Sequence, residues 1–209
     1  MPEPKTKLKG GIAYLKELDT KNRMASSKAA SKLKVIVFLG TVRENRVGLR
    51  VAKFMQKQLE KRNYEVEMFD PLEMKFPLLQ KPVHFYGPER TGAPQWLLDA
   101  EKKYPPALSN MLDHFPGSIF SYKPSAIVCY SPGIYGGMRA AMALRPLLSE
   151  MGTLSVSNIF GIPEVHKALD EEGVPKNDHM EKGAGKLLDQ LDWYTTAMKN
   201  HRNTAGVPQ

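Results

Sequence analysis

The chain has 209 residues, 42% of them hydrophobic, and a formal net charge of +8. That length suits one α/β domain with an additional tail, and the apolar content is enough for a sizeable core, which excludes a wholly disordered chain. No apolar stretch reaches the ~18–20 residues that cross a bilayer, and residues 1–32 lack the apolar centre of a secretory signal.

Most of the positive charge lies near the N-terminus. Residues 1–34 carry nine Lys or Arg against three Asp or Glu, so the rest of the chain is nearly balanced. We therefore expect residues 1–32 to form a basic flexible extension, with Met24 as an alternative start. RNA or anionic lipid binding by this tail is an alternative interpretation, but nucleic acid is not the expected partner.

The first third of the chain predicts a strand, a helix and a second strand. Lys34–Leu39 is apolar and β-branched, and the helix expected over Leu49–Arg62 has apolar residues at spacings of three and four. Tyr64–Phe69 alternates as a strand does, and Asp70-Pro71 ends it. The Pro-rich segment 72–92 predicts a long ordered loop.

The turn after the first strand predicts an anion site. It contains Gly40, Arg43 and Arg46, and it opens into the predicted helix. Free backbone N–H groups, the positive end of the helix dipole and two cationic side chains would meet there. A phosphate is the expected occupant, which indicates a nucleotide or a flavin.

The rest of the chain continues to alternate helices and strands. Helices are predicted over Ala93–Lys103, Pro106–Phe115, Met138–Met151, with a kink near Pro146, and Glu181–Asn200. Strands are predicted over Ser125–Tyr130 and Leu154–Ile159. This order indicates a doubly wound parallel sheet over residues 33–200, with a frayed tail over 201–209. A second glycine-bearing turn, Ser131–Gly137, follows the strand Ser125–Tyr130. Ligands of such sheets bind beyond the carboxyl ends of the strands, where both glycine-bearing turns fall.

One strand is missing from the alternation. Only Tyr104 and Pro105 separate two predicted helices that should enclose a strand. Val83–Tyr86 or Ser118–Tyr122 could replace it. Alternatively, Ser125–Tyr130 could pair directly with Lys34–Leu39, and we expect this direct pairing.

With these elements placed, the chain resembles the NADPH-dependent FMN reductase family of the flavodoxin-like superfamily. The resemblance runs from about Lys34 to Asn200. Its motifs are Gly40–Ala52, Pro105–Asp113, Ser131–Ala141 and Leu147–Gly152. It implies a flavodoxin-like doubly wound parallel sheet, with four strands instead of five because the central third strand and a flavin-contacting loop are absent.

The resemblance also implies which residues bind the cofactor. The FMN phosphate would lie among Thr41, Arg43, Arg46 and Gly48, although many relatives carry a serine at the position of Gly48. Tyr104 would stand near the flavin. The isoalloxazine ring would lie along the turn formed by Ser131, Pro132, Gly133, Ile134, Tyr135 and Gly136.

The activity implied by the resemblance is that of an FMN-dependent NAD(P)H oxidoreductase. Such an enzyme passes hydride from its co-substrate NADPH through bound FMN to a small-molecule electron acceptor: a quinone, an azo compound or a flavin. No side-chain acid or base is expected, and relatives assemble as dimers or tetramers. The alternative is a catalytically silent isoform that lost part of its flavin site and acts by associating with the full-length protein.

Other chemistries find little support in the residue pattern. The five histidines lack metal-ligand spacing, and Ser131 lies in no nucleophile-elbow pattern. The single cysteine, Cys129, sits within an apolar strand and is expected in the core. One cysteine also excludes an intrachain disulfide and fits a reducing compartment, so a cytosolic protein is expected.

Overall fold

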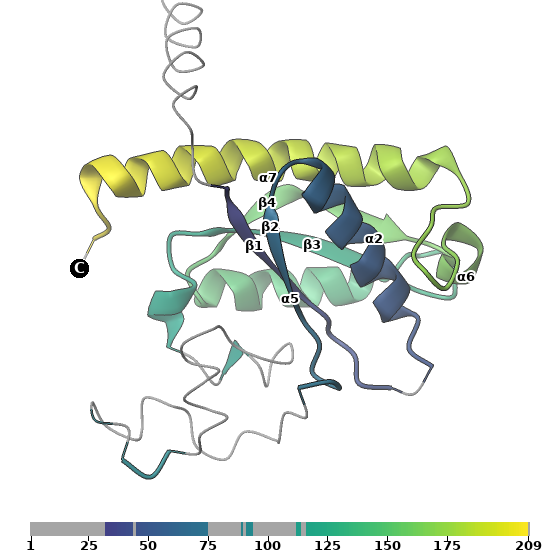
Figure 1. Ribbon diagram of the computed structural model, residues 1–209, viewed down its shortest axis with the longest axis horizontal. Helices are drawn as coiled ribbons and strands as arrows, with labels where there is room; N and C mark the ends of the chain where they lie inside the picture. The colour runs from purple at the N-terminus through teal and green to yellow at the C-terminus, as the bar shows by residue number, and fades with distance from the viewer. Residues whose placement is uncertain are drawn as a thin grey trace, which may run out of the picture. The chain divides into compact units, whose positions relative to one another are not determined.

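The computed structural model describes residues 32–43, 45–74, 89, 91–93, 112, 113 and 116–208 (Figure 1). All of its regular elements lie in the compact unit that begins at Lys34. The strands in the described ranges are β1 (Lys34–Phe38), β2 (Glu65–Phe69), β3 (Pro124–Tyr130) and β4 (Leu154–Ile162). The helices are α2 (Gly48–Lys61), the 3₁₀ turn η2 (Gly117–Ile119), α5 (Met138–Glu150), α6 (Val165–Ala168) and α7 (Asp178–Ala205).

The first part of the fold is a β1-α2-β2 unit. β1 and β2 are parallel, in register from Lys34 opposite Glu65 to Phe38 opposite Phe69. α2 packs on both strands. Its buried residues recur at helical spacing, which is why this segment forms an amphipathic helix: they are Gly48, Val51, Ala52, Phe54, Met55 and Leu59.

The second part is a β3-α5-β4 unit. β3 and β4 are parallel, and α5 packs on both. Ala141 and Leu148 of α5 share a buried cluster with Ile127 and Cys129 of β3, so Cys129 is a core residue as expected. Pro146 stands inside α5.

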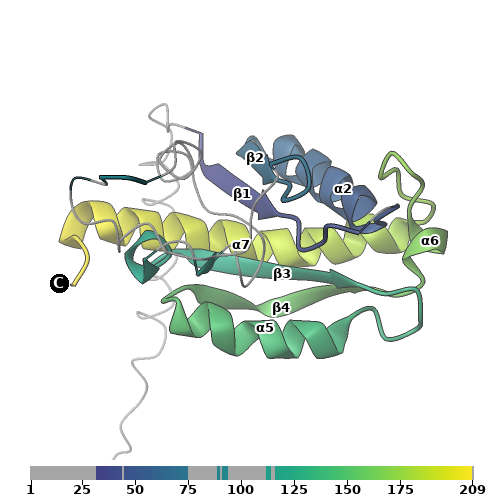
Figure 2. The same ribbon diagram turned by 90° about the horizontal axis from the view of Figure 1, so that it is seen from below.

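Helix α7 connects the two units. It packs against β3, β4 and α2, and Figure 2 shows β3 and β4 between α5 on one side and α7 on the other. Phe160 of β4 lies between Phe54 of α2, with ring centroids 6.5 Å apart, and Gly183 of α7. The Tyr64 hydroxyl donates to Asp192 over 2.6 Å, and burial together with this carboxylate raises the pKa of Tyr64.

The strands do not form one four-stranded sheet. In the part of the chain that the structure describes, β1 pairs with β2 and β3 pairs with β4, so the expected direct pairing of β1 with β3 is wrong. The strands meet through side chains instead, because Phe38 packs against the cluster that contains Ile127 and Cys129.

Helix width does not by itself explain this separation. A helix is about 10 Å wide, roughly two strand spacings, so one helix covers a pair of strands. α2 covers the β1–β2 pair and packs against α7, which covers the β3–β4 pair. These two helices could lie side by side over one continuous sheet, so the missing β1–β3 ladder is a feature of the strand edges and not of the helix layer.

Several boundaries differ from the prediction. The alternative strand Ser118–Tyr122 is the 3₁₀ turn η2 followed by a turn, and β4 continues to Ile162 instead of ending at Ile159. α7 extends through residues 201–205, which the sequence assigned to a frayed tail. Val83–Tyr86 and nearly all of the helices expected between Ala93 and Phe115 lie outside the described residues. Within those residues, no helix combines the length and the apolar content needed to cross a membrane.

Candidate functional site

The loop between β1 and α2 is tied to the end of β2 by a buried ion pair. The Arg46 guanidinium donates to both carboxylate oxygens of Asp70, and its Nη1 also donates to the Thr41 carbonyl over 3.1 Å. The two side chains are only 8% and 4% exposed. Asp70 is the residue that follows β2, so the pair fixes the loop to the carboxyl end of the neighbouring strand.

Asp70 has further partners within its own turn. Its Oδ1 accepts from the backbone N–H groups of Leu72, over 2.9 Å, and Glu73, over 3.4 Å. Both oxygens of the Asp70 carboxylate therefore accept hydrogen bonds, and its negative charge balances the positive charge of Arg46. The exposed cation of the loop is Arg43, whose backbone N–H points to the Thr41 hydroxyl at 3.4 Å.

The head of α2 meets the carboxyl end of β3. A Cβ placed on Gly48 would lie 2.4 Å from Tyr130 Oη and 2.8 Å from Thr41 Cγ2. No side chain caps the α2 N-terminus at Val47, so its first N–H groups have no side-chain acceptor there. Burial raises the pKa of Tyr130, while the nearby charges of Arg43 and Arg46 act in the opposite direction.

The turn after β3 contains glycines of two kinds. Gly136 and Gly137 have φ of +58° and +80°, and a Cβ on them would lie 3.0 Å from Ile162 N and 2.6 Å from Tyr130 O. These two glycines are required by close backbone packing. Gly133 has open space around it, and the neighbouring Ile134 and Tyr135 are 73% and 69% exposed.

The turn is held in place by backbone contacts with the segment after β4. Ser131 Oγ donates to the Gly133 carbonyl over 2.8 Å, the Glu164 N–H donates to Gly133 O, and the Val165 N–H donates to Ser131 O. The backbone of Glu164 takes a left-handed conformation at this junction. The turn is thus fixed while its Ile134–Tyr135 tip faces solvent.

The structure brings together some of the predicted site residues and leaves others apart. Thr41 and Gly48 meet at the head of α2, and Ser131 directly follows Tyr130, whose hydroxyl reaches that point. Tyr104 lies outside the described residues. The sequence interpretation missed Asp70, taken only as a strand end, and Tyr130, taken only as a strand residue. Only their positions indicated a role: Asp70 directly follows β2, and Tyr130 is the last residue of β3.

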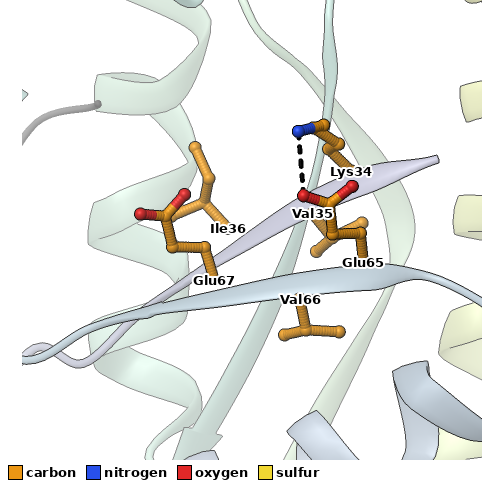
Figure 3. Close-up of a pocket in the computed structure, with 6 residues that line it drawn as sticks. All are labelled: Lys34, Val35, Ile36, Glu65, Val66 and Glu67. Carbon is orange, nitrogen blue, oxygen red and sulfur yellow. Dashed lines mark ion pairs between the residues drawn. The ribbon is translucent and has the colours of Figure 1, made fainter. Parts of the chain in front are cut away.

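A shallow cavity elsewhere on the fold has no relation to this site. It measures about 300 Å³ and is lined by Lys34, Val35, Ile36, Glu65, Val66 and Glu67 (Figure 3). Lys34 and Glu65 form an exposed ion pair of 2.8 Å across it. These residues occupy the amino ends of β1 and β2, opposite the edge at which ligands of parallel sheets bind.

No group of three or more His, Cys, Asp or Glu side chains in the described ranges is arranged to hold a metal ion. The parallel strand pairs, the helices around them and the turns at their carboxyl ends define a flavodoxin-like α/β protein. Residues 101–167 match the family model described as NADPH-dependent FMN reductase. This match confirms the family resemblance seen in the sequence.

A solved structure supports the fold. The chain is similar to FerB, a flavoenzyme NAD(P)H:(acceptor) oxidoreductase from Paracoccus denitrificans, with 22% sequence identity and a TM-score of 0.57. The similarity covers 81% of this chain and 98% of FerB. At this identity the likeness establishes the fold alone. A search of the curated proteins gave no match.

Proposed function

We propose that the chain is an FMN-dependent NAD(P)H oxidoreductase that passes electrons from NADPH to a quinone, an azo compound or a flavin. The observation that carries the proposal is the contact between the head of α2 and Tyr130. It joins the predicted phosphate loop to the predicted isoalloxazine turn, which directly follows Tyr130. The family match over residues 101–167 supports the same reading.

The residues of this edge fit a flavin phosphate. The α2 N-terminus lacks a side-chain cap, so its N–H groups and dipole can hold an anion. Tyr130 presents its hydroxyl beside Gly48, where Thr41 contributes its methyl group, and exposed Arg43 supplies the positive charge. Ser131–Tyr135 would flank the ring, with Gly133 allowing close approach.

When bound, FMN supplies the two-electron chemistry between NADPH and the acceptor. The chain's residues bind, orient and shield it, and no side chain is assigned a proton-transfer role. We also propose that the protein works as a dimer or tetramer, as the family resemblance implies. Light scattering on the purified protein tests the oligomeric state.

The experiment is an FMN titration followed by flavin fluorescence, together with NADPH oxidation in the presence of a quinone. The expected result is saturable binding, a flavin absorption band and quinone-dependent NADPH consumption. Arg43→Met is expected to weaken binding about tenfold, the size of one charge-assisted contact. The matched control is Lys53→Met, which also removes one positive charge. Lys53 lies in α2 and forms an ion pair with Glu172. This variant should leave FMN affinity unchanged.

The second candidate is a catalytically silent isoform that associates with a full-length relative. It is favoured by the division of the four described strands into two pairs, which leaves β1 and β3 without a common ladder. Colourless protein that binds no FMN at saturating concentration would support this candidate and reject the reductase. Stoichiometric flavin and NADPH turnover would reject the silent isoform.

A further inference from the structure

The Arg46 side chain is buried, and protein acceptors already occupy its guanidinium. Its guanidinium contacts three acceptors, two of them on Asp70, and its side chain is 8% exposed. We propose that Arg46 and Asp70 form a latch that positions the anion-binding loop, and that Arg46 supports the phosphate through the Thr41 backbone instead of touching it. The inference rests on the proposed flavin site at the head of α2.

The first argument is mechanical. Asp70 is fixed by two backbone N–H groups of its own turn, and the Leu39 N–H donates to the Phe69 carbonyl over 2.9 Å at the same strand end. Arg46, which is paired with Asp70, also donates a hydrogen bond to the Thr41 carbonyl and so links the end of β2 to the loop. Thr41 Cγ2 in turn lies beside Gly48, the first residue of α2. Arg46 therefore links the α2 head to the end of β2, in addition to the packing of α2 on β1 and β2.

The second argument is electrostatic. A phosphate brought to Arg46 would also approach the Asp70 carboxylate, whose negative charge opposes it. Within a buried pair the two charges largely cancel at a distance. Arg43 is the other cation of residues 40–47, and it is exposed. Arg43 is thus the residue that supplies charge to the anion, while Arg46 supplies geometry.

The variant Asp70→Asn separates the two roles by the sign of its effect. Asn keeps an acceptor oxygen for the Leu72 and Glu73 amides but releases the Arg46 guanidinium from its counter-charge. If Arg46 were a phosphate ligand, freeing it would tighten FMN binding. If it is a positioning residue, the loop loosens and the Kd for FMN rises about tenfold or more. Tighter or unchanged binding overturns the proposal.

A second measurement does not depend on the flavin. Hydrogen exchange in the ligand-free protein should become faster for the loop amides 41–47 in Asp70→Asn, while the α5 amides stay unchanged. Equal loop exchange in the variant and the wild type overturns the latch. If wild-type protein binds no FMN, the proposed function fails, yet the exchange result still decides whether the latch exists.

Two further variants control for folding and for charge. The pair Arg46→Met with Asp70→Asn leaves no unpaired buried charge, so it should fold while losing the link to Thr41. It is expected to bind FMN as weakly as Asp70→Asn, and wild-type affinity would overturn the proposal.

The salt dependence of FMN binding should decrease in Arg43→Met but stay at the wild-type slope in the double variant. A decreased slope in the double variant would identify Arg46 as a phosphate ligand and overturn the proposal.

Discussion

The hydroxyl of Tyr130 stands where a side chain at position 48 would lie, since a Cβ on Gly48 would be 2.4 Å from Tyr130 Oη. Gly48 begins α2 and Tyr130 ends β3, so this contact joins the two βαβ units at their carboxyl edge. The family resemblance places a serine at position 48 in many relatives. Here the Tyr130 hydroxyl takes the space of that side chain.

Serine at position 48 should be better tolerated when the Tyr130 hydroxyl is removed. Gly48→Ser alone is expected to lower the free energy of unfolding by about 1–3 kcal/mol, because the added atoms meet the rigid tyrosine tip. With Tyr130→Phe in the background, the same substitution should cost less, and the remaining cost comes from Thr41 Cγ2, which would lie 2.8 Å from the added Cβ. Urea denaturation of the four proteins in this cycle measures the coupling. Additive effects would show that the two residues do not compete for space.

The two kinds of glycine in the turn after β3 should respond differently to alanine. Gly137→Ala must adopt φ of +80° and bring a Cβ to 2.6 Å from Tyr130 O, so we expect a loss of about 2–4 kcal/mol in unfolding free energy. Gly133→Ala has no such neighbour, and its stability should stay within about 0.5 kcal/mol of wild type. Thermal unfolding compares the two variants, and equal losses would contradict the packing described for this turn.

Two glycines of α7 offer a similar contrast on one helix. A Cβ on Gly183 would lie 2.2 Å from Phe160 Cε2, whereas Gly185 has nothing within 4 Å. Gly183→Ala should therefore destabilise the protein by about 1–3 kcal/mol. Gly185→Ala should stabilise it by about 0.5–1 kcal/mol, because alanine is the better helix former. Denaturant midpoints measure both changes in stability. A stabilising Gly183→Ala would show that α7 does not pack closely against Phe160 of β4 at this position.

Cys129 should be a slow thiol in the native state. It is 9% exposed, and burial raises its pKa, so the reactive thiolate is suppressed near pH 8. Labelling by iodoacetamide should be slower than in urea by about a hundredfold or more, since β3 must open first.

The unfolded thiol ionises at its ordinary pKa of about 8.5, so stability should fall as pH rises through that value. Cys129→Ala removes both the labelling and this part of the pH dependence. Rapid labelling of native protein would place Cys129 outside the core.

Local pattern was enough to predict most described elements. The apolar repeats of Leu49–Arg62 and the alternation of Tyr64–Phe69 place α2 and β2 within one residue of their observed bounds. β4 was predicted to end at Ile159, but its backbone continues the ladder through Gly161, opposite Cys129, to Ile162. The pairing of β1 with β3 could not be judged from pattern, because the two strands are far apart in the chain and local sequence does not set which edges meet.

The site was predictable only where its residues are neighbours in sequence. The loop and the head of α2 follow from a strand, a turn and a helix in immediate succession. The partner of Arg46 is 24 residues away at Asp70, and Tyr130 lies a further 60 residues along the chain. Contacts of this range depend on strand order, which the sequence pattern left open.

The position of α7, which packs against β3, β4 and α2, has a consequence for biosynthesis. The β1-α2-β2 and β3-α5-β4 units each use contacts between nearby segments, which form early. Two parallel strands are marginal by themselves, and α7 is synthesised after both units. Until α7 folds against Phe160 and α2, the nascent chain carries two incomplete halves with unprotected strand edges. During that interval the unpaired strand edges are open to pairing with other chains.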